Sequence, residues 1–195
     1  MSQAKSLMGI EEFIALPIDL RGDRAQFIDG QIVQKTLPSG EHSSAQSEFL
    51  RTLLPKFSRK KQGDGSGGWW IRTEVSVLFP TVSQVFTPDI AGWKRDRLDS
   101  APKGFPVREV PDWICEVSVS TLRYDSRDKL RVFEIERIPF YWVIDVMNER
   151  LIVFETIDGH LIQTRDLYKV DGLQRIPPFD GVELSMAGLF GDEED

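Results

Sequence analysis

The sequence predicts an α/β (α+β) domain whose core is a mixed β-sheet flanked by helices. Three observations carry this prediction. An amphipathic helix near 41–60 precedes three strand-like runs, a second helix near 120–137 follows them, and the strongly β-prone run FYWVIDV (140–146) comes after that helix. The order αβββαβ favours a sheet that carries helices on its faces. Further strands before and after this core, over 24–36 and 150–170, are expected to extend the sheet.

The first elements along the chain are a short helix and a hairpin. The segment GIEEFIAL (9–16) is predicted to be helical. The segment AQFIDGQIVQKT (25–36) is predicted to form a β-hairpin, because the pair Asp29-Gly30 suits the positive φ angles of a type I′ turn.

The first long helix is expected over residues 41–60. Its apolar side chains recur at spacings of three and four residues, as on one face of a helix: Phe49, Leu50, Leu53, Leu54 and Phe57. Pro55 is expected to kink this helix or to end it early, since proline removes a backbone donor. The Gly-rich segment QGDGSGG that follows is predicted to be a loop.

Three strand-like runs make up the centre of the chain: WWIRTEVSVLF (69–79), QVFTPDIAGW (84–93) and DWICEVSVST (112–121). A polar, Pro-containing connector joins the second run to the third. The helix over 120–137 begins behind a Ser/Thr cap, and residues 150–170 are predicted to form a hairpin around Asp158-Gly159.

The length of 195 residues suits one domain with a sizeable core, so residues 1–190 are predicted to form a single domain. The acidic tail GDEED (191–195) is predicted to be disordered. No run of 18 apolar residues is present, the N-terminus lacks the apolar stretch of a signal peptide, and Cys115 is the single cysteine. These features favour a cytoplasmic protein. The net charge of −7 argues against a broad surface that coats nucleic acid, but it permits a local basic groove.

Two acidic residues stand in apolar strand-like runs, which is costly for an ionised carboxylate without a partner. Asp89 lies in FTPDIAGW and Glu116 in WICEVSV. Side chains alternate along a strand, so Glu116 shares a face with Ile114, while Cys115 points the other way. If the strands are neighbours, the two acids can lie side by side, with ~4.5–5.5 Å between Cβ atoms. A divalent metal ion such as Mg²⁺ between them would balance the two charges.

Four motifs follow one another in this chain: TPDIAGW (87–93), PDWICEVSVST (111–121), DSRDK (125–129) and IPFYWVID (138–145). In this order and at these spacings the chain resembles the PD-(D/E)XK nuclease superfamily. More closely, it is similar to the Uma-type family of restriction-endonuclease-like proteins, long catalogued as a domain of unknown function. The resemblance covers about residues 10–190. It implies a restriction-endonuclease-like core, extra N- and C-terminal strands, and hydrolysis of phosphodiester bonds of nucleic acid, DNA in particular, by an endonuclease that needs Mg²⁺ or Mn²⁺.

The resemblance also implies a catalytic set. Asp89 matches the acid of the Pro-Asp strand and Glu116 the second acid, both as metal ligands. The superfamily's lysine would usually stand at Ser118; in the Uma-type branch it has moved to the next helix, where Lys129 matches it. Lys129 would orient the attacking water and steady negative charge. Because nucleases that cut both strands of a duplex often act as symmetric dimers, a homodimer is also expected.

Three further residues are candidates for a supporting role: Glu74, His42 and Asp125, the last one helical turn before the lysine. Basic residues near the motifs are candidates for phosphate contacts: Arg123, Arg127, Arg131, Lys94 and Arg95. Two positions depart from the family pattern. Val119 replaces a proline after the second acid, and Arg137 replaces a loop glycine before the last core strand.

Several of these residues also have a purely structural interpretation. Glu116 could pair with Arg72 in the core, and Lys129 could pair with Asp125 along the helix. His42 could be a helix-start residue, and KRDR (94–97) a solvated loop. Three classes of protein therefore stay open: an endonuclease, a catalytically inactive relative that binds nucleic acid or a protein partner, and a structural module in which the acids form ion pairs.

Overall fold

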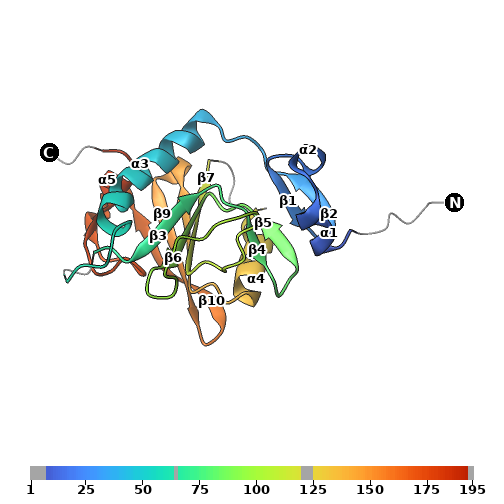
Figure 1. Ribbon diagram of the computed structural model, residues 1–195. Helices are drawn as coiled ribbons and strands as arrows, with labels where there is room; N and C mark the ends of the chain where they lie inside the picture. Colours follow the sequence, from blue (N-terminus) through green and yellow to red (C-terminus); the bar gives the residue numbers. More distant parts are fainter. Residues whose placement is uncertain (1–7, 64–65, 120–124, 193–195) are drawn as a thin grey trace.

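The computed structural model describes residues 8–63, 66–119 and 125–192, with the side chains of 125–128 left out. Six strands form the larger sheet; in chain order they are β3 (Trp69–Thr73), β6 (Ile90–Lys94), β7 (Trp113–Ser118), β8 (Phe140–Asp145), β9 (Arg150–Ile157) and β10 (His160–Tyr168). Their order in space is β10-β9-β8-β7-β6-β3 (Figure 1). Strands β7 and β8 are parallel and the other neighbours are antiparallel, so the predicted mixed α/β fold is confirmed.

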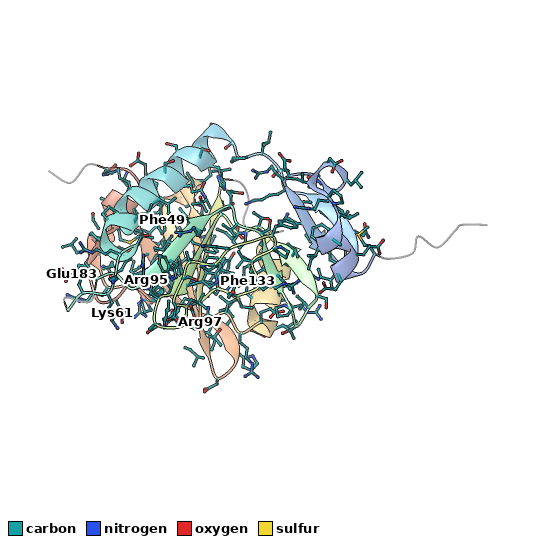
Figure 2. All side chains as sticks on the ribbon, viewed as in Figure 1. Phe49, Lys61, Arg95, Arg97, Phe133 and Glu183 are labelled. Carbon is teal, nitrogen blue, oxygen red and sulfur yellow. The ribbon has the colours of Figure 1, made fainter. Side chains whose placement is uncertain are left out.

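Each face of this sheet packs against one long helix. On one face, the apolar side of α3 (Gly40–Phe57) contributes Phe49 to a core that includes Trp113 and Trp142. On the other face, α4 (Asp125–Ile135) contributes Phe133, which packs against Tyr141 with ring centroids 5.0 Å apart (Figure 2). Alternating side chains of the central strands fill the two cores, as the period of a strand requires.

A second sheet contains four strands: β1 (Ala25–Ile28), β2 (Gln31–Gln34), β4 (Val77–Phe79) and β5 (Gln84–Phe86). Their order in space is β2-β1-β5-β4. The predicted hairpin over 25–36 is confirmed, with the expected positive φ angles at Asp29 and Gly30. Its predicted place is wrong, however, because β1 pairs with β5 and extends the second sheet rather than the first.

The runs 69–79 and 84–93, each predicted as one strand, are both divided between the two sheets. The first run breaks at Glu74, whose φ of 53° lies in the left-handed region that a strand does not use. The second run breaks over Thr87–Asp89, where Pro88 has no N–H for a sheet ladder. Both breaks lie beside each other, since the Glu74 N–H donates to the Asp89 carbonyl at 3.2 Å. The chain therefore changes sheet next to the predicted acid.

Helix α3 begins behind Ser39, whose hydroxyl accepts the backbone N–H of His42. The helix continues past Pro55 and ends at Phe57, three residues before the predicted end. Pro55 lacks the N–H that would bond to the Arg51 carbonyl, and the helix ends two residues later, as expected for a proline that ends it early. Helix α4 is described only from Asp125, so the predicted start at residue 120 lies outside the described residues.

The hairpin predicted around Asp158-Gly159 is confirmed by β9 and β10, which form one edge of the larger sheet. Arg137, at the position of the family's loop glycine, adopts a φ of 56° and so keeps the left-handed conformation that a glycine would favour. The turn after Val119 lies outside the described residues, as do 193–195 of the acidic tail. Within the described part of the chain, no helix has both the length and the apolar character needed to cross a membrane.

The remaining elements are short: α1 (Ile10–Ala15), α2 (Ile18–Arg21), η1 (Val146–Asn148), η2 (Lys169–Asp171), β11 (Leu173–Gln174), β12 (Leu184–Ser185) and α5 (Met186–Leu189). The first of these confirms the helix predicted over 9–16. The last packs on α3, where the Thr52 hydroxyl donates to the Gly188 carbonyl at 3.0 Å.

Candidate active site

Asp89 directly precedes β6, and Glu116 lies on β7, the antiparallel neighbour of β6. The ladder between the two strands ends at the pair Ile90 and Cys115, so the two acids follow at the same end of it, and the Val117 N–H donates to Asp89 Oδ2. Two residues further into the strands, Ala91 and Ile114 pack in the same core, so the two acids share a face as predicted. Both are buried, at 3% and 8% exposure. Their roles in catalysis and metal binding stay predictions.

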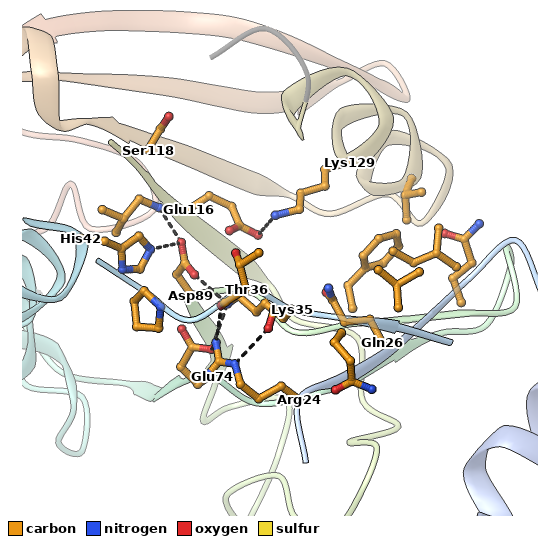
Figure 3. A pocket seen from close by; sticks show the side chains of 18 of the residues that line it. Arg24, Gln26, Lys35, Thr36, His42, Glu74, Asp89, Glu116, Ser118 and Lys129 are labelled. Carbon is orange, nitrogen blue, oxygen red and sulfur yellow. Dashed lines mark hydrogen bonds and ion pairs between the residues drawn. The ribbon is translucent and has the colours of Figure 1, made fainter. Parts of the chain in front are cut away.

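Both carboxylate oxygens of Asp89 already have partners (Figure 3). Oδ1 accepts the Lys35 ammonium at 2.7 Å. Oδ2 accepts the Val117 backbone N–H at 2.8 Å and lies 3.0 Å from His42 Nε2. The Asp89 carbonyl accepts the amide of Gln46 at 2.8 Å. The backbone and the side chain of Asp89 are therefore held by α3, by β7 and by the segment after β2.

Glu116 is paired with the predicted lysine. Lys129, in the second turn of α4, places Nζ 3.2 Å from Glu116 Oε1. The alternative partner Arg72 is contradicted, because its guanidinium donates to the Ile71 carbonyl and lies 5.9 Å over the Trp70 ring. The side chain of Asp125 lies outside the described residues, so its pairing stays a prediction.

Glu74 and His42, the two residues proposed as supporting, both reach the neighbourhood of Asp89. Glu74 Oε2 accepts Lys35 at 2.9 Å and Arg24 at 3.3 Å. The left-handed backbone at Glu74 is a costly conformation for a non-glycine residue, and such conformations gather at functional sites. His42 combines both interpretations offered for it, since its backbone N–H is capped by Ser39 and its ring contacts Asp89.

The two acids face a cavity of about 800 Å³ between the second sheet, α4 and the segment that leads from β2 to α3. Four basic side chains line it: Arg24, Lys35, Lys129 and Arg131. Ser118, where the superfamily's lysine usually stands, also lines it. Four acidic residues line it as well, Asp29, Glu74, Asp89 and Glu116, so basic and acidic side chains are equal in number on its wall.

Of the other predicted phosphate contacts, Lys94 and Arg95 do not line this cavity. Lys94 is at the far end of β6 from Asp89, roughly 16 Å along the strand at the usual rise per residue. Arg95 is held in place by the carbonyls of Trp69 and Ser58 and stacks 3.4 Å over the Trp70 ring. Arg123 and the side chain of Arg127 lie outside the described residues.

The surroundings shift the pKa values of the two acids in opposite directions. Burial opposes the ionisation of Asp89, but the His42 hydrogen bond and the Lys35 charge outweigh it, and the pKa of Asp89 is lowered well below its usual range. For Glu116, burial dominates over the nearby charge of Lys129 and raises its pKa to about 7. The hydrogen bond to Asp89 raises the pKa of His42. One carboxylate is thus firmly ionised while the other gains or loses a proton near neutral pH.

The raised pKa of Glu116 predicts that stability falls with pH in metal-free buffer. Between pH 4.5 and 7 the folded protein retains a proton that the unfolded chain has lost, so the free energy of unfolding decreases as the pH rises through this window. The full rise of the pKa from 4.5 to about 7 corresponds to roughly 3 kcal/mol. Urea unfolding at pH 5 and pH 8 with EDTA should show this loss, and Glu116→Gln should remove most of it. If the free energy of unfolding fell by the same amount between pH 5 and pH 8 in both proteins, this prediction would be contradicted.

Lys35, Arg24 and Gln46 were not found from the sequence. Lys35 directly follows the edge strand β2, where lysines are usually solvated, and it contacts Asp89, which lies 54 positions away in the chain. Gln46 did carry a weak signal, because it lies four residues after His42 and so on the same face of α3. Arg24 precedes a hairpin and shows no pattern that points to Glu74.

Comparisons with known proteins place the chain among nuclease-like proteins. Residues 10–187 match the profile of the Uma2 family, described as "Putative restriction endonuclease". The fold is similar to a solved structure from Anabaena variabilis, described as "a putative nuclease belonging to DUF820", with a TM-score of 0.67 and 21% identity over 94% of this chain and 97% of that chain. No curated protein matches the chain. The resemblance stated from the four motifs is confirmed.

Proposed function

Because the chain belongs to the Uma2 family of restriction-endonuclease-like proteins, we propose that it is a metal-dependent endonuclease that hydrolyses phosphodiester bonds of DNA. One observation on the structure supports this proposal independently of the family match. Asp89, directly before β6, and Glu116, on β7, line one cavity together with four basic side chains, and Lys129 pairs with Glu116. Perturbed ionisable groups that converge in a cavity are typical of catalytic sites.

The two acids fit a hard divalent cation. Such an ion commonly takes one or two carboxylates from the protein and completes its shell with water and phosphate oxygens. Among the described residues, no cluster of three or more His, Cys, Asp or Glu side chains could hold a metal, so Asp89 and Glu116 would supply the protein's side-chain ligands. The proton on Glu116 near neutral pH must leave first, which the positive charge of Lys129 favours.

Each residue around the metal would then have its own role in the reaction. When bound, Mg²⁺ or Mn²⁺ would acidify a water and draw charge from the phosphate oxygens. Lys129, with Nζ beside Glu116, would orient that water and steady the negative charge that develops. His42 and the Val117 N–H fix the orientation of the Asp89 carboxylate. Arg24 and Arg131 stand on the cavity wall, where they can contact phosphates next to the reacting one.

We also propose that the protein acts as a homodimer, because a symmetric pair presents one site to each strand of a duplex. Light scattering that gives the monomer mass of 22.3 kDa at every concentration would contradict the dimer without affecting the chemistry.

The activity is tested by incubation of the purified protein with supercoiled plasmid. We expect nicked and linear DNA in the presence of Mg²⁺ or Mn²⁺, none in EDTA, and none with Glu116→Ala in either condition. Intact plasmid in every reaction, from a protein shown to be folded, would argue against the nuclease.

A second candidate function is binding of nucleic acid, or of a protein partner, without catalysis. The observation that favours it is the charge balance of the site, where a lysine already neutralises each acid. Such a protein would retard DNA in a gel with or without metal ions, and the plasmid would stay intact.

A further inference from the structure

Lys35 reaches the carboxylates of Asp89 and Glu74 (Figure 3), and the Thr87 carbonyl completes a cage of three oxygen atoms around its ammonium. Its ammonium lies 2.7 Å from Asp89 Oδ1, 2.9 Å from Glu74 Oε2 and 2.9 Å from the Thr87 carbonyl oxygen. An ammonium has three N–H donors, and each of them has one acceptor here. The side chain is only 15% exposed. Lys35 is therefore held as a fixed internal cation, unlike the flexible lysines of a protein surface.

The oxygens around this ammonium are of the kinds that a hard divalent cation uses. Two carboxylates and one backbone carbonyl are ordinary ligands of Mg²⁺ and Ca²⁺. Of the Asp89 oxygens, Oδ2 is held by His42 and the Val117 N–H, so Oδ1 is the oxygen on which a metal ion and the lysine would meet.

The cage is held together by contacts that do not involve Lys35. The Glu74 N–H donates to the Asp89 carbonyl, and Gln46 donates to the same carbonyl. The Gln26 amide oxygen accepts the Thr87 N–H at 3.0 Å. Arg24 holds the Glu74 carboxylate from the other side. Removal of the ammonium would therefore leave the oxygens near their present positions.

We propose that Lys35 is a built-in competitor of the metal, so that a divalent ion reaches Asp89 by exchange with the Lys35 ammonium. This inference rests on the proposed function, since it concerns the same metal site. A dipositive ion on Asp89 Oδ1 and an ammonium hydrogen-bonded to that oxygen would repel each other strongly at such short range in a partly buried site. The two therefore exclude each other. Without metal, Lys35 keeps the buried Asp89 paired; with metal, its ammonium leaves the cage.

The first test is calorimetric titration of Mn²⁺ into the wild-type protein and Lys35→Met. Methionine keeps most of the aliphatic stem and removes the charge, so the competing cation is lost while packing is retained. We expect the dissociation constant for Mn²⁺ to fall by at least about 10-fold. The matched control is Lys169→Met. Lys169 also bridges two carboxylates, Glu149 and Asp192, each at 2.9 Å, but it lies outside the cavity, and its loss should leave Mn²⁺ affinity unchanged.

A second test needs no variant and so does not depend on how Lys35→Met folds. Lysines of the wild-type protein are labelled by reductive methylation, with and without saturating Mg²⁺, and the rates are read by mass spectrometry of peptides. Lys35 should be protected without Mg²⁺ and should react several-fold faster with it, while Lys169 reacts equally in both conditions.

The outcomes separate this inference from the proposed function. Mn²⁺ binding by the wild-type protein, with equal or weaker affinity in Lys35→Met and unchanged labelling of Lys35, would overturn the exchange and leave the metal site intact. Absence of Mn²⁺ binding from both proteins would overturn the metal site and the exchange together. Tighter binding by Lys35→Met, or binding by that variant alone, supports the exchange.

Discussion

Asp89→Asn is expected to lower Mg²⁺-dependent plasmid cleavage by at least about 10³-fold and to remove Mn²⁺ binding. The substitution replaces one of the two carboxylates proposed as metal ligands with a neutral amide of the same shape. Loss of a metal that stabilises charge in the transition state removes several kcal/mol, and each 1.36 kcal/mol is a factor of ten in rate. Cleavage kinetics and calorimetry on the same preparation measure the two losses.

The control for this substitution is Asp112→Asn. Asp112 is also a buried acid, just before β7, where it accepts both Nε and Nη2 of Arg97 and the backbone N–H of Lys94. Its loss should cost stability, on the order of 1–3 kcal/mol, because buried donors lose their acceptor. Metal binding and cleavage should be retained. If Asp89→Asn still bound Mn²⁺ and cleaved like the wild-type protein, Asp89 would not be a ligand.

Lys129→Met is expected to separate catalysis from metal binding. Lys129 carries a positive charge and cannot bind a cation, so its loss should leave Mn²⁺ affinity intact or slightly improved. Cleavage should fall by roughly 10²-fold or more, the usual scale for a positioned acid–base or charge-stabilising group. Lys129→Arg should restore little activity, since the guanidinium is bulkier and keeps its proton.

The titration of Lys129→Met needs an alkaline buffer. The charge of Lys129 lowers the pKa of Glu116, so its removal pushes that pKa further above 7 and leaves Glu116 protonated at neutral pH. Near pH 9 Glu116 is closer to full ionisation in both proteins, and their affinities can be compared directly. If Lys129 merely formed an ion pair on the helix surface, its loss would change stability by under ~1 kcal/mol, and full cleavage by Lys129→Met would exclude it from the site.

The facing pair of acids could be predicted from the sequence because it follows from local rules. Alternation along a strand places Glu116 with Ile114 and away from Cys115, and the same rule places Asp89 with Ala91. Lys129 was found through the family motif, since nothing in DSRDK itself distinguishes a site lysine from a partner of Asp125. The structure places Lys129 beside Glu116, while its pairing with Asp125 stays a prediction.

The division into two sheets could not be predicted, because WWIRTEVSVLF is β-prone on both sides of Glu74 and gives no sign of its positive φ. The Lys35 contact was hidden for a different reason. The contact depends on how the second sheet lies against the first, and a lysine just after an edge strand belongs to no periodic pattern. The buried charge of Asp89 suggested a metal ion, but in this structure Lys35 balances that charge.

The most direct test of the metal site is a crystal structure of the protein with Mn²⁺, with diffraction data recorded at the manganese absorption edge. We predict an anomalous peak about 2 Å from a carboxylate oxygen of both Asp89 and Glu116, with the Lys35 ammonium moved off Asp89 Oδ1. No peak at this position at saturating Mn²⁺, with Lys35 still on Asp89 and Lys129 still on Glu116, would contradict a metal-dependent nuclease site.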